Sequence, residues 1–157
     1  MLAATFAGIG FGNAGVHLCH AMSYAVAGLV KSLYVDGYPR ERPLVPHGMS
    51  VVLTAPAVFR WTAATDPARH LAMAKAMGAD VSGVPLADAG ACLADQIVTL
   101  MRQTGMPDGL ASIGYTPGDL DALVESTLPQ QRIIAMSPRP PDPAAFRQLF
   151  LDSMRIW

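Results

Sequence analysis

Three of the four histidines lie in the first third of the chain, at His17, His20 and His47. His17 and His20 are three residues apart, which places them on neighbouring faces of a helix. His47 follows Pro46 at the entrance of a further expected helix. A fold that brings the face of His20 against that entrance would put His20 and His47 on one metal ion. A histidine on an apolar helix is more often a hydrogen-bonded core residue, so spacing alone leaves both interpretations open.

Other polar residues near these histidines have several interpretations. Tyr24 lies one helical turn after His20, so the two share a face, where Tyr24 is either a packing aromatic or part of a site. A zinc cluster of His17, Cys19 and His20 is disfavoured, because adjacent and next-but-one positions on a helix diverge and cannot converge on one tetrahedral ion. His70 is expected to be solvated on a surface helix.

The elements that must position these residues have helical periodicity. Three segments each place a capping side chain before a proline: Asp66–Pro67, Thr116–Pro117 and Asp142–Pro143. The cap oxygen accepts a free backbone N–H, and proline loses no hydrogen bond at the first helical position. Apolar residues at helical spacing follow each of them, whereas two-residue alternation does not persist. Val51–Leu53 fits either a strand or a short helix. The sequence predicts one all-α domain over residues 1–157.

The first 30 residues carry no charged side chain, which suggests a membrane span. Polar side chains interrupt the segment at Asn13, His17, His20 and Ser23. No basic cluster is present to orient a span or to start a signal peptide. We therefore expect no membrane and a buried core helix, in which the glycines of 8–12 permit close helix packing rather than phosphate binding.

The composition limits the class of partner. Hydrophobic residues make up 52% of the chain and charged residues 15%, against about a quarter charged in ordinary domains. This excess of apolar surface indicates a face buried against another protein, and it leaves a homo-oligomer open. The net charge is −1 without a basic stripe, so nucleic acid is a poor partner. Cys19 and Cys92 are too few for a disulfide framework, which favours a cytoplasmic location.

The segments 13–24 and 46–48 together carry a family resemblance. Asn-Ala-Gly-Val-His-Leu-Cys-His-Ala-Met-Ser-Tyr, followed by Pro-His-Gly, resembles the second half of the signature of iron-containing alcohol dehydrogenases. In that family a His-Ala-Met or His-Gly-Met run and a later Pro-His-Gly each give one imidazole to a divalent iron. The resemblance implies that His20 and His47 are metal ligands.

Further details are similar to the hydroxyacid-oxoacid transhydrogenase branch of this family. The resemblance extends through Thr127–Gln130 and the Pro138–Arg139 element. Most members have a second histidine, near the nicotinamide, where this chain has Tyr24, and the connector between the two ligands is longer here. The match implies a catalytic position for Tyr24. Because phenols keep their proton at neutral pH, Tyr24 would donate a hydrogen bond or pass a proton rather than act as a base.

The resemblance also implies the wider architecture. The chain would be the helical C-terminal half of a dehydroquinate-synthase-like fold. An α/β domain absent from this chain would bind NAD, and an Asp and another His that precede this chain would complete the metal site. Met1 runs into a helix without a cap, which is typical of a sequence cut from a larger protein. Iron follows from the family, and zinc is possible because imidazole suits both metals.

The implied activity is hydride transfer from an alcohol or a hydroxyacid such as 4-hydroxybutyrate to NAD, with the metal as Lewis acid. In the transhydrogenase branch the hydride then passes to 2-oxoglutarate. This chain alone is expected to be inactive, because it lacks a phosphate-binding turn and part of the ligand set. The alternative is a non-catalytic remnant or an interaction module that keeps the helical core without the chemistry.

Overall fold

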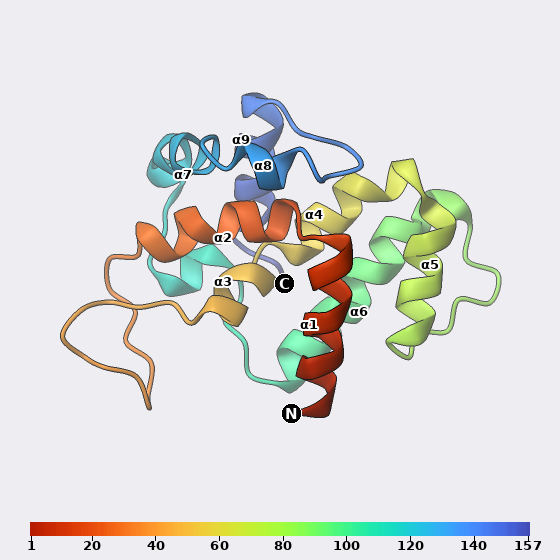
Figure 1. Ribbon diagram of the computed structural model, residues 1–157, viewed down its shortest axis with the longest axis horizontal. Coiled ribbons are helices and arrows are strands. Elements are labelled where there is room, and N and C mark those ends of the chain that lie inside the picture. Colours follow the sequence, from red (N-terminus) through yellow and green to blue (C-terminus); the bar gives the residue numbers. More distant parts are fainter.

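The computed structural model describes all residues 1–157 and contains helices but no strands, as the sequence predicts (Figure 1). The α-helices are α1 (Leu2–Ala14), α2 (Leu18–Gly28), α3 (His47–Val52), α4 (Ala55–Thr62), α5 (Pro67–Ala76), α6 (Ala89–Gln103), α7 (Leu120–Thr127), α8 (Gln131–Ile134) and α9 (Pro143–Asp152). Short 3-10 turns precede or follow several of them. Residues 51–52, which the sequence left open between strand and helix, belong to α3.

Helix α2 is central to the packing. It packs against α3 on one side and against α7 and α8 on the other, while α6 packs against α4 and α5 (Figure 1). Leu18, Met22 and Val26 of α2 are fully buried, and they join Phe146 and Phe150 of α9 in one hydrophobic cluster. Because the helix that carries His20 is held in this core, its first turn has a fixed position.

The predicted helix starts are present. The carboxylate of Asp66 accepts the N–H of Arg69 at 3.0 Å, and that of Asp142 accepts the N–H of Ala145 at 2.7 Å. Thr116 instead precedes a 3-10 turn, Pro117–Asp119, that leads into α7. Local capping chemistry therefore set these boundaries, as expected for side chains that satisfy free N–H groups.

The expectation of one buried helix at the N-terminus is wrong in its first half. The segment forms two helices, α1 and α2, that meet at an angle of 111°. Gly15 lies between them with φ +77°, a left-handed conformation that glycine adopts without strain and that ends α1. Only α2 enters the core. No single helix has the length and hydropathy of a membrane span, although α1 and α2 have them as a bent pair.

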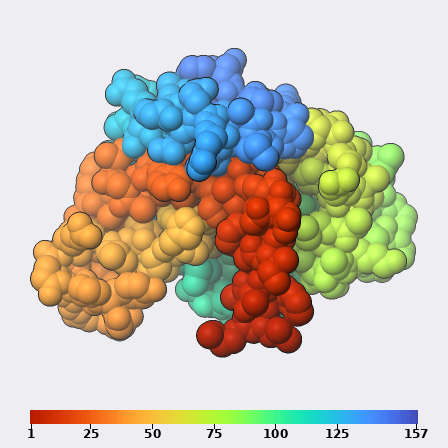
Figure 2. All heavy atoms as spheres, viewed as in Figure 1, coloured from red at the N-terminus to blue at the C-terminus, as the bar shows by residue number.

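Helix α1 has no buried residue (Figure 2). Its large apolar side chains are more than half exposed at Leu2, Phe6, Ile9 and Phe11. A Cβ atom added at Gly8, Gly10 or Gly12 would meet nothing within 4 Å. The predicted close packing at these glycines is therefore absent, because no other helix of this chain reaches them.

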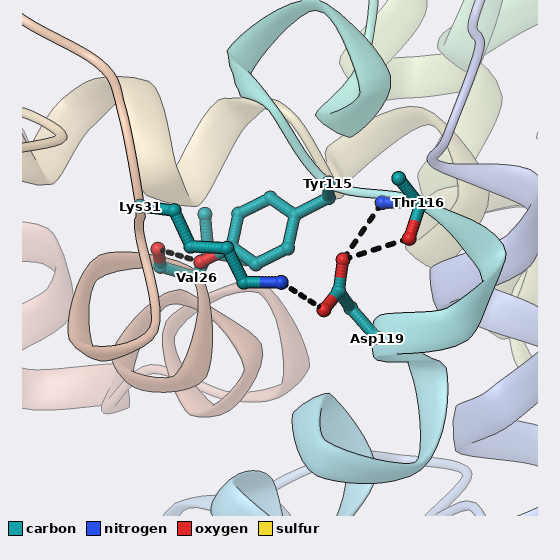
Figure 3. Close-up of polar contacts among 5 residues, drawn as sticks. All are labelled: Val26, Lys31, Tyr115, Thr116 and Asp119. Atoms are coloured by element: carbon teal, nitrogen blue, oxygen red, sulfur yellow. Dashed lines mark hydrogen bonds and ion pairs between the residues drawn. The ribbon is translucent and has the colours of Figure 1, made fainter.

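The other end of α2 is held by Tyr115 (Figure 3). The Tyr115 hydroxyl donates a 2.7 Å hydrogen bond to the carbonyl of Val26, which lies in the last turn of α2, where carbonyls lack helical partners. Burial, and then the charge of Asp119, raises the pKa of Tyr115, so the phenol stays a donor. Lys31 forms an ion pair with Asp119, whose carboxylate also accepts the N–H of Thr116 at 2.9 Å.

Candidate metal centre

The fold brings His20 and His47 together. His20 lies in the first turn of α2 and His47 is the first residue of α3. Their ring centroids are 5.3 Å apart with an angle of 59° between the ring planes. The long connector that separates them in sequence therefore does not separate them in space.

This spacing fits a shared cation. Metal–nitrogen bonds of about 2.0–2.1 Å place the centroids of two imidazoles on one ion about 5 Å apart at ordinary ligand angles. Burial, and then the neighbouring charge of His47, lowers the pKa of His20, which favours the neutral form that binds metals. No third His, Cys, Asp or Glu of the chain joins the pair in a metal-binding group. This chain therefore contributes two imidazole donors.

Two buried serines fix the backbone at the histidines in the same way. The Ser23 hydroxyl donates to the carbonyl of His20, and the Ser50 hydroxyl donates to the carbonyl of His47, both at 2.8 Å. Ser23 and Ser50 are 1% and 0% exposed. Both bonds lie within one helical turn, and the burial of the two serines shows that this face of each helix start points into the core.

The remaining residues that the sequence singled out lie elsewhere. Tyr24 follows His20 by one turn of α2 and is 51% exposed. Cys19 is buried, which raises the pKa of its thiol to about 12. A thiol that keeps its proton is a poor metal ligand. The ring of His17 lies against Phe59, edge-on, with centroids 6.4 Å apart.

A large apolar cavity lies beside His20. Its volume is about 710 Å³, and helices α1 to α6 all contribute to its wall. Most of its lining is aliphatic, aromatic or methionine, including Met73, Met77 and Met101, and its polar side chains are His17, His20 and Thr104. The sequence gives no sign of this cavity, because its wall combines residues from helices that only tertiary packing brings together.

His70 was expected to be solvated, and this expectation is wrong. His70 is 9% exposed. Its Nε2 lies 3.0 Å from the hydroxyl of Thr62 and its Nδ1 lies 2.8 Å from the carbonyl of Asp66. The ring also packs edge-on against Phe59 at 6.0 Å. The first turn of α5 places His70 against Thr62 and Phe59 of α4. The charged neighbour Arg69 suggested a solvated position, because the sequence does not show this packing.

Comparison with known proteins shows the class to which this fold and pair of histidines belong. Residues 1–154 match the family described as "Fe-containing alcohol dehydrogenase family, C-terminal". The chain belongs to this family.

Curated relatives place the chain near one branch of the family. Over its whole length it is 49% identical to a probable mitochondrial hydroxyacid-oxoacid transhydrogenase from Dictyostelium discoideum, and the match covers 29% of that protein. Over 99% of its length it is 50% identical to the mitochondrial hydroxyacid-oxoacid transhydrogenase of Homo sapiens, and the match covers 33% of that protein. These relatives confirm the resemblance to the transhydrogenase branch. The chain spans about a third of their length.

Solved structures share the fold. The alcohol dehydrogenase from Oenococcus oeni superposes with a TM-score of 0.79 at 24% identity, over 94% of this chain and 35% of that protein. A 1,3-propanediol oxidoreductase gives 0.71 at 22% identity, over 86% of this chain and 32% of that protein. The predicted helical half of the dehydrogenase fold is therefore confirmed.

The expected cytoplasmic location is contradicted. The transhydrogenases to which the chain is similar are named mitochondrial. The expectation rested on two unpaired cysteines, Cys19 and Cys92. A low cysteine count argues against an oxidising compartment, but it does not distinguish one reducing compartment from another.

Proposed function

We propose that this chain is the metal-binding C-terminal part of an NAD-linked alcohol or hydroxyacid oxidoreductase of the transhydrogenase type. The observation that carries the proposal is the 5.3 Å separation of the His20 and His47 rings. The similarity to hydroxyacid-oxoacid transhydrogenases supports it. In this proposal residues 1–157 form a single metal-binding domain.

His20 and His47 would hold a divalent cation, iron by family membership, with zinc as the chemically equivalent alternative. The bound cation would supply Lewis-acid activation of an alcohol oxygen, which favours the alkoxide and eases the departure of hydride. The two imidazoles would bind and orient the cation, and the apolar cavity beside His20, once covered, would keep water from the reacting carbon.

The rest of the site would come from the part of the polypeptide that the relatives have beyond this span. That part would hold NAD on an α/β domain and supply the remaining ligands. The exposed apolar side chains of α1 and the open apolar cavity are the surfaces that it would cover. A contiguous apolar surface of this kind is typical of an interface.

Tyr24 would face the nicotinamide and the substrate. It is half exposed and lies one turn from His20 on the same helix, so its hydroxyl is available to a neighbouring domain. In the complete enzyme, Tyr24→Phe is expected to lower the rate of hydride transfer about tenfold or more while leaving the affinity for the metal unchanged. Equal rates for the two proteins would remove Tyr24 from the mechanism.

Metal titration of the chain tests the proposal directly. Calorimetry with Fe²⁺ under anaerobic conditions, and with Zn²⁺, should show one site that His20→Ala or His47→Ala weakens about 100-fold. His70→Asn is the matched control, because His70 already hydrogen-bonds to the protein through both nitrogens. If the two alanine variants bind as tightly as the unmodified chain, the proposal fails.

An activity assay tests the other half of the proposal. The purified chain with NAD, ferrous iron and 4-hydroxybutyrate should give no turnover above a His20→Ala control, because the nucleotide-binding part is missing. Turnover well above that control would refute the proposal that NAD binding and the remaining metal ligands come from outside this span.

A further inference from the structure

His17 has an unused imidazole at the start of the helix that carries His20. Its Nδ1 is the one buried side-chain nitrogen or oxygen of the chain without a hydrogen-bond partner. Its backbone carbonyl, in contrast, accepts the N–H groups of His20 and Ala21 at 2.9 and 3.0 Å. The residue is therefore held firmly in place while its ring remains unpaired. Buried polar groups are nearly always satisfied, so this exception requires an explanation.

Comparison with His70 shows that the unpaired state is not a consequence of the surroundings alone. Both imidazoles pack edge-on against Phe59, at 6.4 Å for His17 and 6.0 Å for His70. His70 uses both nitrogens, on Thr62 and Asp66. The two histidines pack on the same aromatic ring, but only His70 has hydrogen-bond partners in the protein for its ring nitrogens.

The cavity indicates which hydrogen-bond partner the ring of His17 could have. His17 and His20 both line the 710 Å³ cavity, whose wall is otherwise mostly apolar. The hydroxyl of Thr104, the other polar side chain, already donates to the carbonyls of Leu100 and Met101. With His20 assigned to the metal, His17 is the polar side chain of this wall whose ring has neither a hydrogen bond nor an assigned ligand. Nδ1 is buried and unpaired, so a ligand in the cavity would have to use the other ring nitrogen, Nε2.

The imidazole of His17 carries at least one N–H in either protonation state. A neutral imidazole carries one proton, and placing it on Nε2 turns an N–H donor toward the cavity. An apolar wall with one N–H donor suits a ligand that has a short hydrocarbon chain and an anionic acceptor.

We propose that the Nε2–H of His17 binds the carboxylate of a hydroxyacid whose hydroxyl end lies at the His20–His47 pair. The inference rests on the proposed function and adds the group that distinguishes an acid from a simple alcohol. A donor placed for one acceptor discriminates against ligands that lack it, because the empty site leaves the N–H unpaired. The methylene groups of the acid would contact the methionines and the other apolar side chains of the wall.

Binding of a matched pair of ligands to the Zn²⁺-loaded chain tests this. We choose 4-hydroxybutyrate and butan-1-ol, which share a hydroxyl and a hydrocarbon chain but differ in the carboxylate. In a chain labelled with ¹⁵N-histidine, 4-hydroxybutyrate should shift the His17 Nε2 resonance and butan-1-ol should not. Absence of that shift overturns the proposal.

Two substitutions separate a binding role from a packing role. His17→Phe keeps the edge contact with Phe59 but removes the donor, and it should weaken 4-hydroxybutyrate binding by about tenfold or more while changing butan-1-ol and Zn²⁺ binding less than about twofold. His17→Gln places an amide N–H near the position of Nε2 and should recover part of the acid binding. His70→Asn should leave the preference for the acid unchanged. Equal weakening of acid and alcohol by His17→Phe would show a structural role only.

The same titrations distinguish this proposal from the metal site. If His20→Ala retains full Zn²⁺ affinity, the metal assignment fails. The preference of the unmodified chain for acid over alcohol, and its loss in His17→Phe, can still be measured without metal. If the metal assignment holds and His17→Phe binds both ligands normally, the carboxylate assignment alone is overturned.

Discussion

The rings of His20 and His47 lie 5.3 Å apart although the residues lie in the first turns of two different helices. Each residue is fixed by a buried serine three positions later, through a hydrogen bond to its backbone carbonyl. The pair is therefore set by the packing of α2 on α3 rather than by contacts between the two imidazoles. A preformed pair of donors needs little rearrangement to bind a cation.

The two histidines should act as one unit in metal binding. Zn²⁺ at about 100 times its Kd should raise the free energy of unfolding of the unmodified chain by about 2.7 kcal/mol. His20→Ala and His47→Ala should each remove nearly all of this gain, and the double variant should lose little more, because residues that share one ligand are not additive. Thermal unfolding of each variant with and without Zn²⁺ measures this stabilisation. Additive losses would mean two independent sites.

Tyr115→Phe should destabilise the fold by about 1–2 kcal/mol, because it leaves the Val26 carbonyl without its donor at the end of α2. Urea unfolding followed by circular dichroism measures this difference. Tyr38→Phe is the control, since Tyr38 is 46% exposed and its hydroxyl makes no hydrogen bond within the chain. An unchanged unfolding midpoint for Tyr115→Phe would contradict the role of this bond in anchoring α2.

Gly90 permits the close contact of α6 with α4. A Cβ atom there would lie 2.8 Å from the Cβ of Ala63 and 3.1 Å from the Cα of Arg60. Gly90→Ala should therefore cost about 1–3 kcal/mol through overpacking. Gly8→Ala, in the uncovered helix α1, should instead be neutral or stabilising by up to about 1 kcal/mol. Chemical denaturation of both variants compares them, and equal effects would contradict the close packing.

Asp119 should make the stability depend on pH in the acid range. Its hydrogen bond to Lys31, followed by that to the Thr116 N–H, lowers the pKa of Asp119 below its ordinary value of 3.8. The unfolded chain therefore binds the proton more tightly, so this contribution is complete above pH 3.8 and is lost as the pH falls through the folded-state pKa.

Asp119→Asn should accordingly lower the free energy of unfolding at pH 7, and the difference from the unmodified chain should shrink as the pH falls below 3.8. Asp121→Asn, which removes an exposed ion pair with Arg147, is the control and should have little effect at any pH. Unfolding curves at several pH values provide the measurement. A difference that is independent of pH would exclude the carboxylate charge as its cause.

Features that depend on near neighbours in the chain were predictable from the sequence. The side chains of Asp66 and Asp142 cap N–H groups three residues later, so their types and the prolines after them determine the helix starts. The motif that contains His20 and the Pro-His-Gly that contains His47 identified the family before any fold was known. The same motif did not show how far apart the two rings lie.

Other features depend on contacts between distant segments, and only the tertiary structure decided them. Gly15 breaks the apolar N-terminal segment, so α2 enters the core while α1 does not. His70 is buried because the first turn of α5 meets α4, and His17 lies beside Phe59 without a partner for its Nδ1. The residue types and spacing determined an all-helical chain with two candidate ligands. The packing of α2 on α3 decided that those ligands meet, because short-range periodicity specifies which face is apolar but not which helix covers it.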